Sequence, residues 1–190
     1  KTAYEIRPRD WSSDVCSSDL GKDIVVGTTG WYHRLPELRP KMTRSALLYS
    51  ANFSLGVNLY FRIVRQAAAL IQKSPDYDPF VHELHHRQKV DSPSGTALKL
   101  AEILLSEIDR KKNVLTESSR GKIDPSALHV TSTRAGSFAG THTVGFDCEA
   151  DTIEITHVAK NRRGFALGAV RAAHWVHGRS GVFTMDDVEL

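Results

Sequence analysis

The stretch from Glu83 to Ala97 holds the densest set of chemically active side chains. It reads Glu-Leu-His-His-Arg-Gln-Lys-Val-Asp-Ser-Pro-Ser-Gly-Thr-Ala, with His85 and His86 adjacent and Lys89 four residues after the first histidine. A histidine exchanges protons near neutral pH, and a lysine supplies a mobile cation and an acid. This combination predicts a site where a small, negatively charged substrate receives a proton.

The same stretch ends in a turn that opens a helix. Ser94, Gly95 and Thr96 lead into an apolar pattern of helical spacing over residues 96–111. The first N–H groups of a helix lack partners within the helix and lie at the positive end of its dipole, so they attract anions. Ser94 is also a suitable helix cap, and capping is compatible with ligand binding. We therefore expect these three residues to bind the substrate.

The stretch from Glu83 to Ala97 strongly resembles the signature of the 4-hydroxy-tetrahydrodipicolinate (dihydrodipicolinate) reductases of bacterial lysine and diaminopimelate synthesis. Four further stretches are similar to the family in the same order, so that the resemblance covers residues 21–190. These stretches are Gly27–Gly30, Ser50–Asn58, Arg134–His142 and the tail Gly181–Leu190.

The resemblance implies hydride transfer from NADH or NADPH to an unsaturated cyclic dicarboxylate, with tetrahydrodipicolinate as the product. It gives proton donation to His85 and an acid role to Lys89. It gives substrate contacts to His86, Gly95 and Thr96. It further implies a homotetramer in the cytoplasm. No residue of these motifs decides between NADH and NADPH.

Two loops are expected to touch the nicotinamide nucleotide, as the resemblance implies. Each follows a short apolar run that predicts a parallel strand, and open α/β sheets bind ligands at the carboxyl ends of such strands. The loop residues are Gly27, Thr28 and Thr29 after the run at 23–26, and Ser50, Ala51, Asn52 and Phe53 after the run at 46–49.

The order of elements predicts an α/β fold of mixed α+β character. Helical spacing at 35–44 and 56–72 follows the two apolar runs, which favours part of a doubly wound dinucleotide-binding domain. A strand at 80–84, the helix at 96–111 and a polar loop at 112–126 come next. The remaining expectations are antiparallel strands at 129–134, 141–148 and 152–158 in a mixed sheet, a helix at 164–178 and a tail at 183–190.

The domain boundaries follow from these elements. We expect a partial dinucleotide-binding domain at 21–53 and 160–190, and a substrate-binding and oligomerisation domain at 54–159. Residues 1–20 are rich in Ser and Asp and are expected to be an unrelated, disordered leader. The family's glycine-rich dinucleotide loop has no counterpart, because the first glycine is Gly21. A second hypothesis is therefore an inactive, truncated substrate-binding and oligomerisation module.

A third, remote hypothesis is a zinc hydrolase, because residues 82–86 also fit the pattern H-E-x-x-H. That pattern binds zinc only on a helix, where both histidines share a face, and Glu83 would then be a general base. In the reductase interpretation Glu83 either supports the site from behind the substrate-contacting residues or is simply a residue of the strand. Arg134 and His142 flank a glycine-rich turn, and two roles stay open for them, exposed hairpin residues or substrate contacts.

Composition narrows the function classes. The net charge is +3, and no Lys/Arg cluster is interleaved with aromatic residues, which does not favour nucleic-acid binding. No apolar run approaches the roughly 20 residues of a membrane-spanning helix. The two cysteines, Cys16 and Cys148, provide neither a disulfide framework nor a four-thiolate metal site. The reductase interpretation includes no metal.

Overall fold

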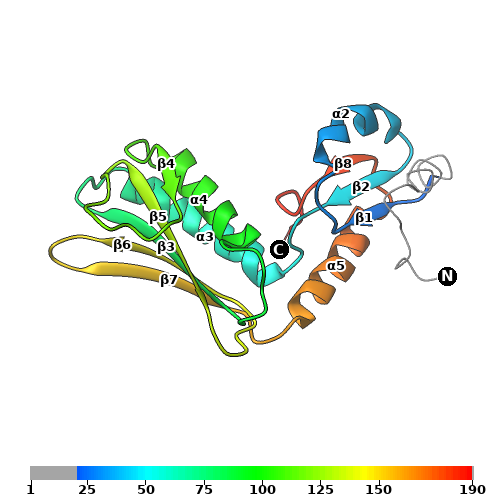
Figure 1. The fold of residues 1–190 in the computed structure, drawn as a ribbon. Helices are drawn as coiled ribbons and strands as arrows, with labels where there is room; N and C mark the ends of the chain where they lie inside the picture. Colours follow the sequence, from blue (N-terminus) through cyan, green and yellow to red (C-terminus); the bar gives the residue numbers. More distant parts are fainter. Residues whose placement is uncertain (1–20, 190) are drawn as a thin grey trace. The chain divides into compact units, whose positions relative to one another are not determined.

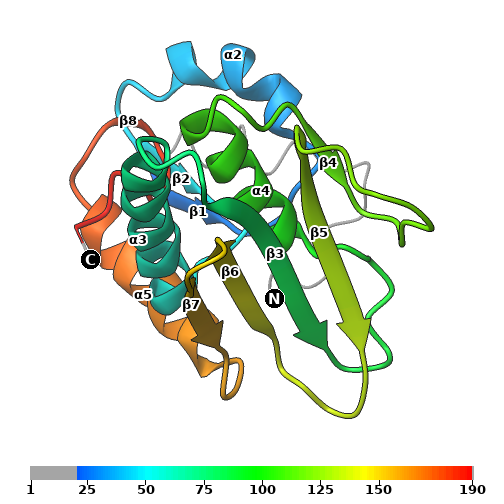
Figure 2. The same cartoon turned by 90° about the vertical axis from the view of Figure 1, so that its left-hand side faces the viewer.

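The computed structural model describes residues 21–189, which form two compact units (Figures 1 and 2). One unit comprises residues 21–54 and 165–189, and the other comprises residues 55–164. The leader expected at residues 1–20 lies outside the described residues. Over the described range, none of the helices has the length and apolar character needed to cross a membrane.

The unit of residues 55–164 is a five-stranded mixed sheet with two helices on one face (Figure 1). The strand order is β4-β5-β3-β6-β7, so β3 is central, parallel to β5 and antiparallel to β6. The elements in chain order are α3 (Leu55–Ile71), β3 (Asp78–His85), α4 (Gly95–Glu107), β4 (Asn113–Leu115), β5 (Ala127–Arg134), β6 (Thr141–Asp147) and β7 (Thr152–Val158).

Strand β3 alternates between a buried and a half-exposed face. Val81 belongs to the hydrophobic core that α3 and α4 form with the sheet, and Glu83 and His85 follow it on the same buried face. Successive strand residues point to opposite faces of a sheet. The carboxylate of Glu83 and the imidazole of His85 therefore both lie in the buried layer next to the core.

Two expectations about this sheet were wrong. The strand at 127–134 is parallel to β3 and is not paired with β6, because the connection through α4 crosses over and returns in the same direction. The segment 112–126 contains β4, which pairs with β5. Three residues are too few to show a strand period in a sequence. The antiparallel pairing of β6 with β7 and the mixed character of the sheet are confirmed.

The other unit contains a parallel three-stranded sheet in the order β1-β2-β8. Its strands are β1 (Ile24–Val26), β2 (Ala46–Tyr49) and β8 (Gly181–Phe183), and helix α5 (Arg163–Val176) precedes β8. Strand β8, which pairs with β2, was not expected from the sequence, and it overlaps the tail expected at 183–190 at Phe183.

The single helix expected at 35–44 was also wrong. Two short helical segments, α2 (Leu35–Leu38) and η2 (Arg39–Lys41), cover the first part of this range, and η1 (Tyr32–Arg34) precedes them. A proline lies in the first turn of α2 and another in the first turn of η2. Proline lacks the N–H that continues a helix, so each proline favours a new start and prevents one continuous helix.

Candidate functional site

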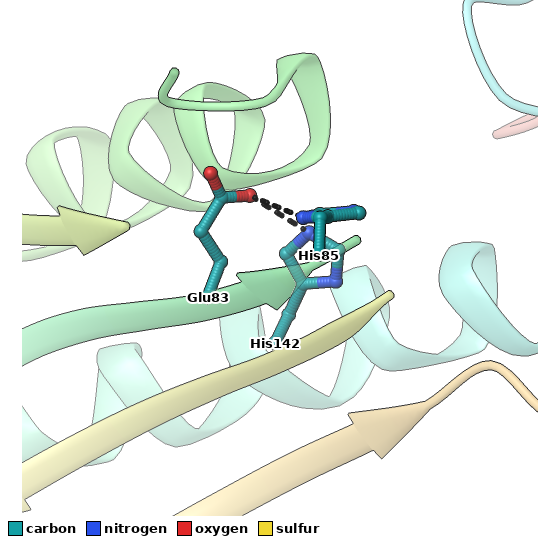
Figure 3. Close-up of side chains that lie close together, drawn as sticks. All are labelled: Glu83, His85 and His142. Carbon is teal, nitrogen blue, oxygen red and sulfur yellow. Dashed lines mark ion pairs between the residues drawn. The ribbon is translucent and has the colours of Figure 1, made fainter. Parts of the chain in front are cut away.

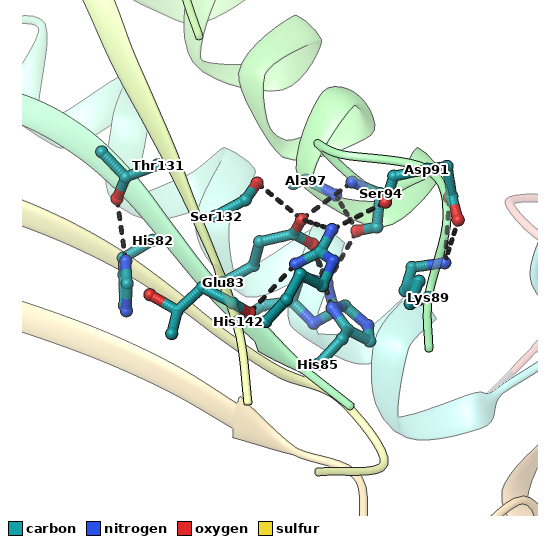
Figure 4. A network of polar contacts seen from close by, with 12 residues as sticks. His82, Glu83, His85, Lys89, Asp91, Ser94, Ala97, Thr131, Ser132 and His142 are labelled. Atoms are coloured by element: carbon teal, nitrogen blue, oxygen red, sulfur yellow. Dashed lines mark hydrogen bonds and ion pairs between the residues drawn. The ribbon is translucent and has the colours of Figure 1, made fainter. Parts of the chain in front are cut away.

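Glu83 is the centre of a buried polar network at the carboxyl end of β3 (Figure 4). Its Oε1 accepts three hydrogen bonds, from the backbone N–H of Ser94 at 2.9 Å, the hydroxyl of Ser132 at 2.8 Å and the guanidinium of Arg134 at 2.7 Å. A carboxylate without solvent contact requires such donors, because burying an unpaired charge is costly. Three donors therefore fix this oxygen in place.

The second oxygen of Glu83 faces two imidazoles. Oε2 lies 3.3 Å from Nδ1 of His85 and 3.4 Å from Nε2 of His142, and Figure 3 shows both contacts converging on the same oxygen. The two rings meet edge to face with their centroids 5.0 Å apart. Among residues 21–189, no donor makes a regular hydrogen bond to this oxygen. Its environment is therefore set by these two histidines.

The sheet register explains why these groups meet. Glu83 pairs with Ser132 on the parallel side of β3 and with His142 on the antiparallel side. Paired residues project from the same face of a sheet. Side chains that lie almost 50 and 60 positions apart in the sequence therefore flank one carboxylate.

Ser94 joins this network to the start of α4. Its hydroxyl lies 3.1 Å from Nε2 of His142 and accepts the N–H of Ala97 at 3.2 Å, which makes Ser94 the N-cap of the helix. Gly95 is the first residue of α4, so the positive end of this helix lies beside the imidazoles. This arrangement suits an anion that also requires a proton donor.

The protonation states follow from burial and neighbours. Burial favours a raised pKa for Glu83, but the contact with His142 and the hydrogen bonds from Ser94 and other donors outweigh burial and hold the pKa below its ordinary value. Burial lowers the pKa of His85 to about 4, against the attraction of Glu83 and with repulsion from His142, Lys89 and Arg134. At neutral pH the network thus contains a carboxylate beside a neutral His85.

Lys89 lies on the loop between β3 and α4. Its ammonium forms an ion pair with Asp91 at 2.7 Å, and this contact lowers the pKa of Asp91. The guanidinium of Arg134 donates to the backbone carbonyl of Asp91 at 2.7 Å as well as to Glu83. The loop that carries Lys89 is thereby tied to the Glu83 network.

Glu83, His85 and His142 offer three ligand atoms within 4.8 Å of one another. The guanidinium of Arg134, 2.7 Å from Glu83, opposes a further cation there, so we interpret the cluster as a charge-paired hydrogen-bond network. The zinc-hydrolase hypothesis was wrong, because residues 82–85 belong to a strand. His82 lies on the other face of β3, where it contacts Thr131 at 2.8 Å.

His86 lies outside this buried network. Its backbone N–H donates to the carbonyl of Phe138 at 2.9 Å, which connects the loop after β3 to the loop before β6. A shallow hollow of about 370 Å³ lies between these loops and is lined by His86, Arg87, Gln88, Gly136 and Ser137. The hollow reaches His86 and none of the three residues in Figure 3.

In the other unit, the two loops expected to touch a nucleotide lie at one edge of the parallel sheet. Gly27 follows β1 and Ser50 follows β2, and the N–H of Ser50 donates to the carbonyl of Val26 at 3.0 Å. The hydroxyl of Ser50 bonds the backbone of Asn52. A Cβ placed on Gly27 would lie 3.5 Å from the ring of Phe53, so the two loops are in contact. Thr28, Thr29 and Ala51 belong to the same loops.

A protein-family model agrees with the family indicated by the sequence motifs. The family model described as "Dihydrodipicolinate reductase, C-terminus" matches residues 56–188, well over half of the chain. The chain belongs to the dihydrodipicolinate reductase family. The resemblance found in the sequence is thereby confirmed.

Named relatives in this reductase family cover most of the chain. The 4-hydroxy-tetrahydrodipicolinate reductase of Christiangramia forsetii is 42% identical over 167 residues, which are 87% of this chain and 68% of the relative. The enzyme of the same name from Neisseria meningitidis is 39% identical over 171 residues, 87% of this chain and 63% of the relative. The chain thus spans about two thirds of the length of these curated relatives.

A solved structure shows the same fold. The dipicolinate-bound dihydrodipicolinate reductase from Paenisporosarcina sp. TG-14 superposes with a TM-score of 0.69 at 22% identity, over 90% of this chain and 66% of that one. The mixed α/β fold expected for the reductase family is confirmed.

The structure brings together some of the residues expected in the substrate site. His85 and Ser94 both contact Glu83, and Gly95 and Thr96 open the helix that Ser94 caps. Sequence reasoning missed the central position of Glu83. The signal was its place two residues before His85, which puts both side chains on one strand face. The roles of Arg134 and His142 required the register.

Proposed function

We propose that this chain serves the NAD(P)H-dependent reduction of 4-hydroxy-tetrahydrodipicolinate to tetrahydrodipicolinate in lysine and diaminopimelate biosynthesis. The observation that carries the proposal is the contact chain from His85 through Glu83 to Ser94, which places a proton-exchanging group beside the start of α4. A cyclic dicarboxylate needs both an anion site and a proton donor, and family membership supports this substrate class.

The proposal gives a substrate-binding or proton-donating role to each residue of the candidate site. Ser94, Gly95 and Thr96 hold a substrate carboxylate at the helix start, and His86 contacts the substrate from the adjoining loop. Lys89 leaves its partner Asp91 to balance the anionic charge and serves as an acid. His85 is neutral in the free chain, since burial lowers its pKa to about 4. A bound dianion favours protonated His85, which then donates the proton.

The nicotinamide cofactor, NADH or NADPH, supplies the hydride when it is bound. We assign its contacts to the two loops at the edge of the parallel sheet. These residues are Gly27, Thr28, Thr29, Ser50, Ala51, Asn52 and Phe53. The sheet edge suits this role because open α/β sheets bind nucleotides beyond the carboxyl ends of their strands, where Gly27 leaves room that a side chain would fill.

A reductase assay of the chain tests the proposal, with a full-length relative as the positive control. NADPH and NADH are each supplied with freshly generated substrate, and oxidation of the cofactor is followed. His85→Gln is expected to lower turnover by roughly 10²–10⁴-fold, the usual contribution of a general acid. An unchanged rate in the variant would remove His85 from the chemistry.

A second candidate is a substrate-binding and oligomerisation module without activity. The specific observation in its favour is that the family match is to the C-terminal part of these reductases, at residues 56–188. Titration of NADPH and of pyridine-2,6-dicarboxylate separates the candidates. Binding of both ligands supports the enzyme, whereas binding of the dicarboxylate alone supports the module.

We also propose that the chain assembles into a homotetramer in the cytoplasm. The face of the five-stranded sheet opposite α3 and α4 carries half-buried residues, including Phe80, His82 and Leu84 on β3. Partly exposed apolar side chains on a sheet face suit packing against another copy. Sedimentation of the wild-type chain and of Leu84→Lys tests this proposal, and a wild-type monomer would contradict it.

A further inference from the structure

The two oxygens of Glu83 have different environments, and this difference has a chemical consequence. Oε1 receives donors from three directions, while Oε2, within residues 21–189, is in contact with the imidazoles of His85 and His142. Oε1 is therefore committed to holding the carboxylate in place. Oε2 is available to determine which nitrogen of the neighbouring imidazole carries the proton.

Neutral imidazole carries one proton, on either Nδ1 or Nε2. Nδ1 of His85 lies 3.3 Å from Oε2 of a carboxylate that is ionised at neutral pH, so the favoured form carries the proton on Nδ1. Nε2 faces the other way, toward Gly140, where an added Cβ would lie only 3.0 Å from it. In this form Nε2 has the free lone pair.

We propose that Glu83 is the positioning residue of the site: it holds His85 as the Nδ1–H tautomer and thereby makes Nε2 the nitrogen that exchanges a proton with the substrate. Through the same carboxylate, Glu83 fixes His85 relative to Ser94 at the start of α4. The inference deepens the proposed function and rests on it only for the substrate.

The variant Glu83→Gln tests this role, because the different surroundings of the two Glu83 oxygens determine how the glutamine amide is oriented. The three donors at Oε1 require the amide oxygen of glutamine in that place, which leaves the amide NH₂ in the place of Oε2. An NH₂ group donates and does not accept, so Nδ1 of His85 must become the acceptor. The tautomer of His85 is therefore expected to reverse to Nε2–H while the side chain keeps its shape.

The matched control is Ser132→Ala. It removes one donor from Oε1 at 2.8 Å and leaves Oε2 unchanged. The tautomer of His85 is expected to stay Nδ1–H in this variant, although the same buried network has lost a hydrogen bond. A general loosening of the network would alter both variants, whereas the positioning role predicts a change in Glu83→Gln alone.

The measurement is nitrogen NMR of histidine-labelled protein at neutral pH, where long-range couplings between ring nitrogens and carbon-bound protons identify the tautomer. His85 is assigned by its loss in His85→Gln. An Nε2–H form of His85 in the wild type would overturn the proposal without any variant. An unchanged tautomer in folded Glu83→Gln would overturn it as well.

Kinetics separate this proposal from the proposed function. In an active chain, Glu83→Gln is expected to lower kcat by roughly 10²–10⁴-fold with a much smaller change in KM, as for other carboxylates that orient a catalytic imidazole. If the NMR result holds and the wild type has no reductase activity, the positioning role stands and the proposed function falls. If the wild type is active and its His85 is the Nε2–H tautomer, the proposed function stands and the positioning role falls.

Discussion

The backbone N–H of Ser94 donates to Oε1 of Glu83 at 2.9 Å, which joins the end of β3 to the start of α4. The hydroxyl of the same serine caps the helix through Ala97 and contacts His142. The helix start and the imidazole cluster are thus held by one residue. The stability of the site depends on both functions of this serine.

Replacing Ser94 by alanine tests its side-chain contribution. Ser94→Ala keeps the backbone bond to Glu83 and removes the cap and the contact with His142, so the free energy of unfolding should fall by about 1–2 kcal/mol. Urea unfolding measures this change. The control is Ser106→Ala, whose hydroxyl bonds the carbonyl of Ile103 within the same helix and caps nothing. Equal losses in both variants would contradict the capping role.

The stability of the folded chain should fall as the pH decreases from about 6.5 to about 4. Burial lowers the pKa of His85 from 6.5 to about 4, so within this window the unfolded chain binds a proton that the folded chain does not. The stabilisation is complete above the ordinary pKa and is lost below it, with a contribution of at most about 3 kcal/mol from His85.

Urea unfolding across this pH window measures the effect. Glu83, His142, Lys89 and Arg134 surround His85 and remain in the variant His85→Gln, so the variant isolates the histidine. Its stability should depend less steeply on pH than that of the wild type. Identical slopes would show that another group titrates in this range.

Gly145 allows the ring of Phe80 to cross its strand. The two residues are paired across β3 and β6, and a Cβ at Gly145 would overlap the Phe80 ring. Gly145→Ala should therefore reduce the free energy of unfolding by roughly 1–3 kcal/mol, the usual cost of overpacking. Gly121→Ala is the control, because no atom of residues 21–189 lies within 4 Å of its added Cβ. Equal free energies of unfolding in the two variants would contradict this prediction.

Lys111 is buried and holds the segment that precedes β5. Its ammonium donates to the carbonyls of Pro125 and Ala127, both at 2.8 Å, and pairs with Asp78 at 2.5 Å. Lys111→Met removes these two hydrogen bonds and the ion pair and should cost roughly 2–4 kcal/mol. The exposed neighbour Lys112 serves as the control through Lys112→Met, which should change stability by less than about 0.5 kcal/mol. Thermal and urea unfolding both measure this difference.

Several features of the fold were predictable from local patterns. The helical spacing of Val57, Tyr60 and Val64 and the serine before Gly95 predicted α3 and the start of α4, because periodicity and capping are local properties. The parallel partner of β3 was not predictable in this way. The sequence of residues 127–134 has the same strand pattern whichever strand lies beside it. The crossover through α4 decides which strand these residues join.

The sequence by itself determined the family, and it predicted the histidine proposed to exchange a proton and the helix start proposed to attract an anion, because these depend on residue types and spacings within fifteen positions. Only the tertiary structure decided that Glu83 is central and that Ser132, Arg134 and His142 surround it. The physical reason is that a buried carboxylate takes its donors from whichever strands the register places beside it, and register follows from the packing of the whole sheet.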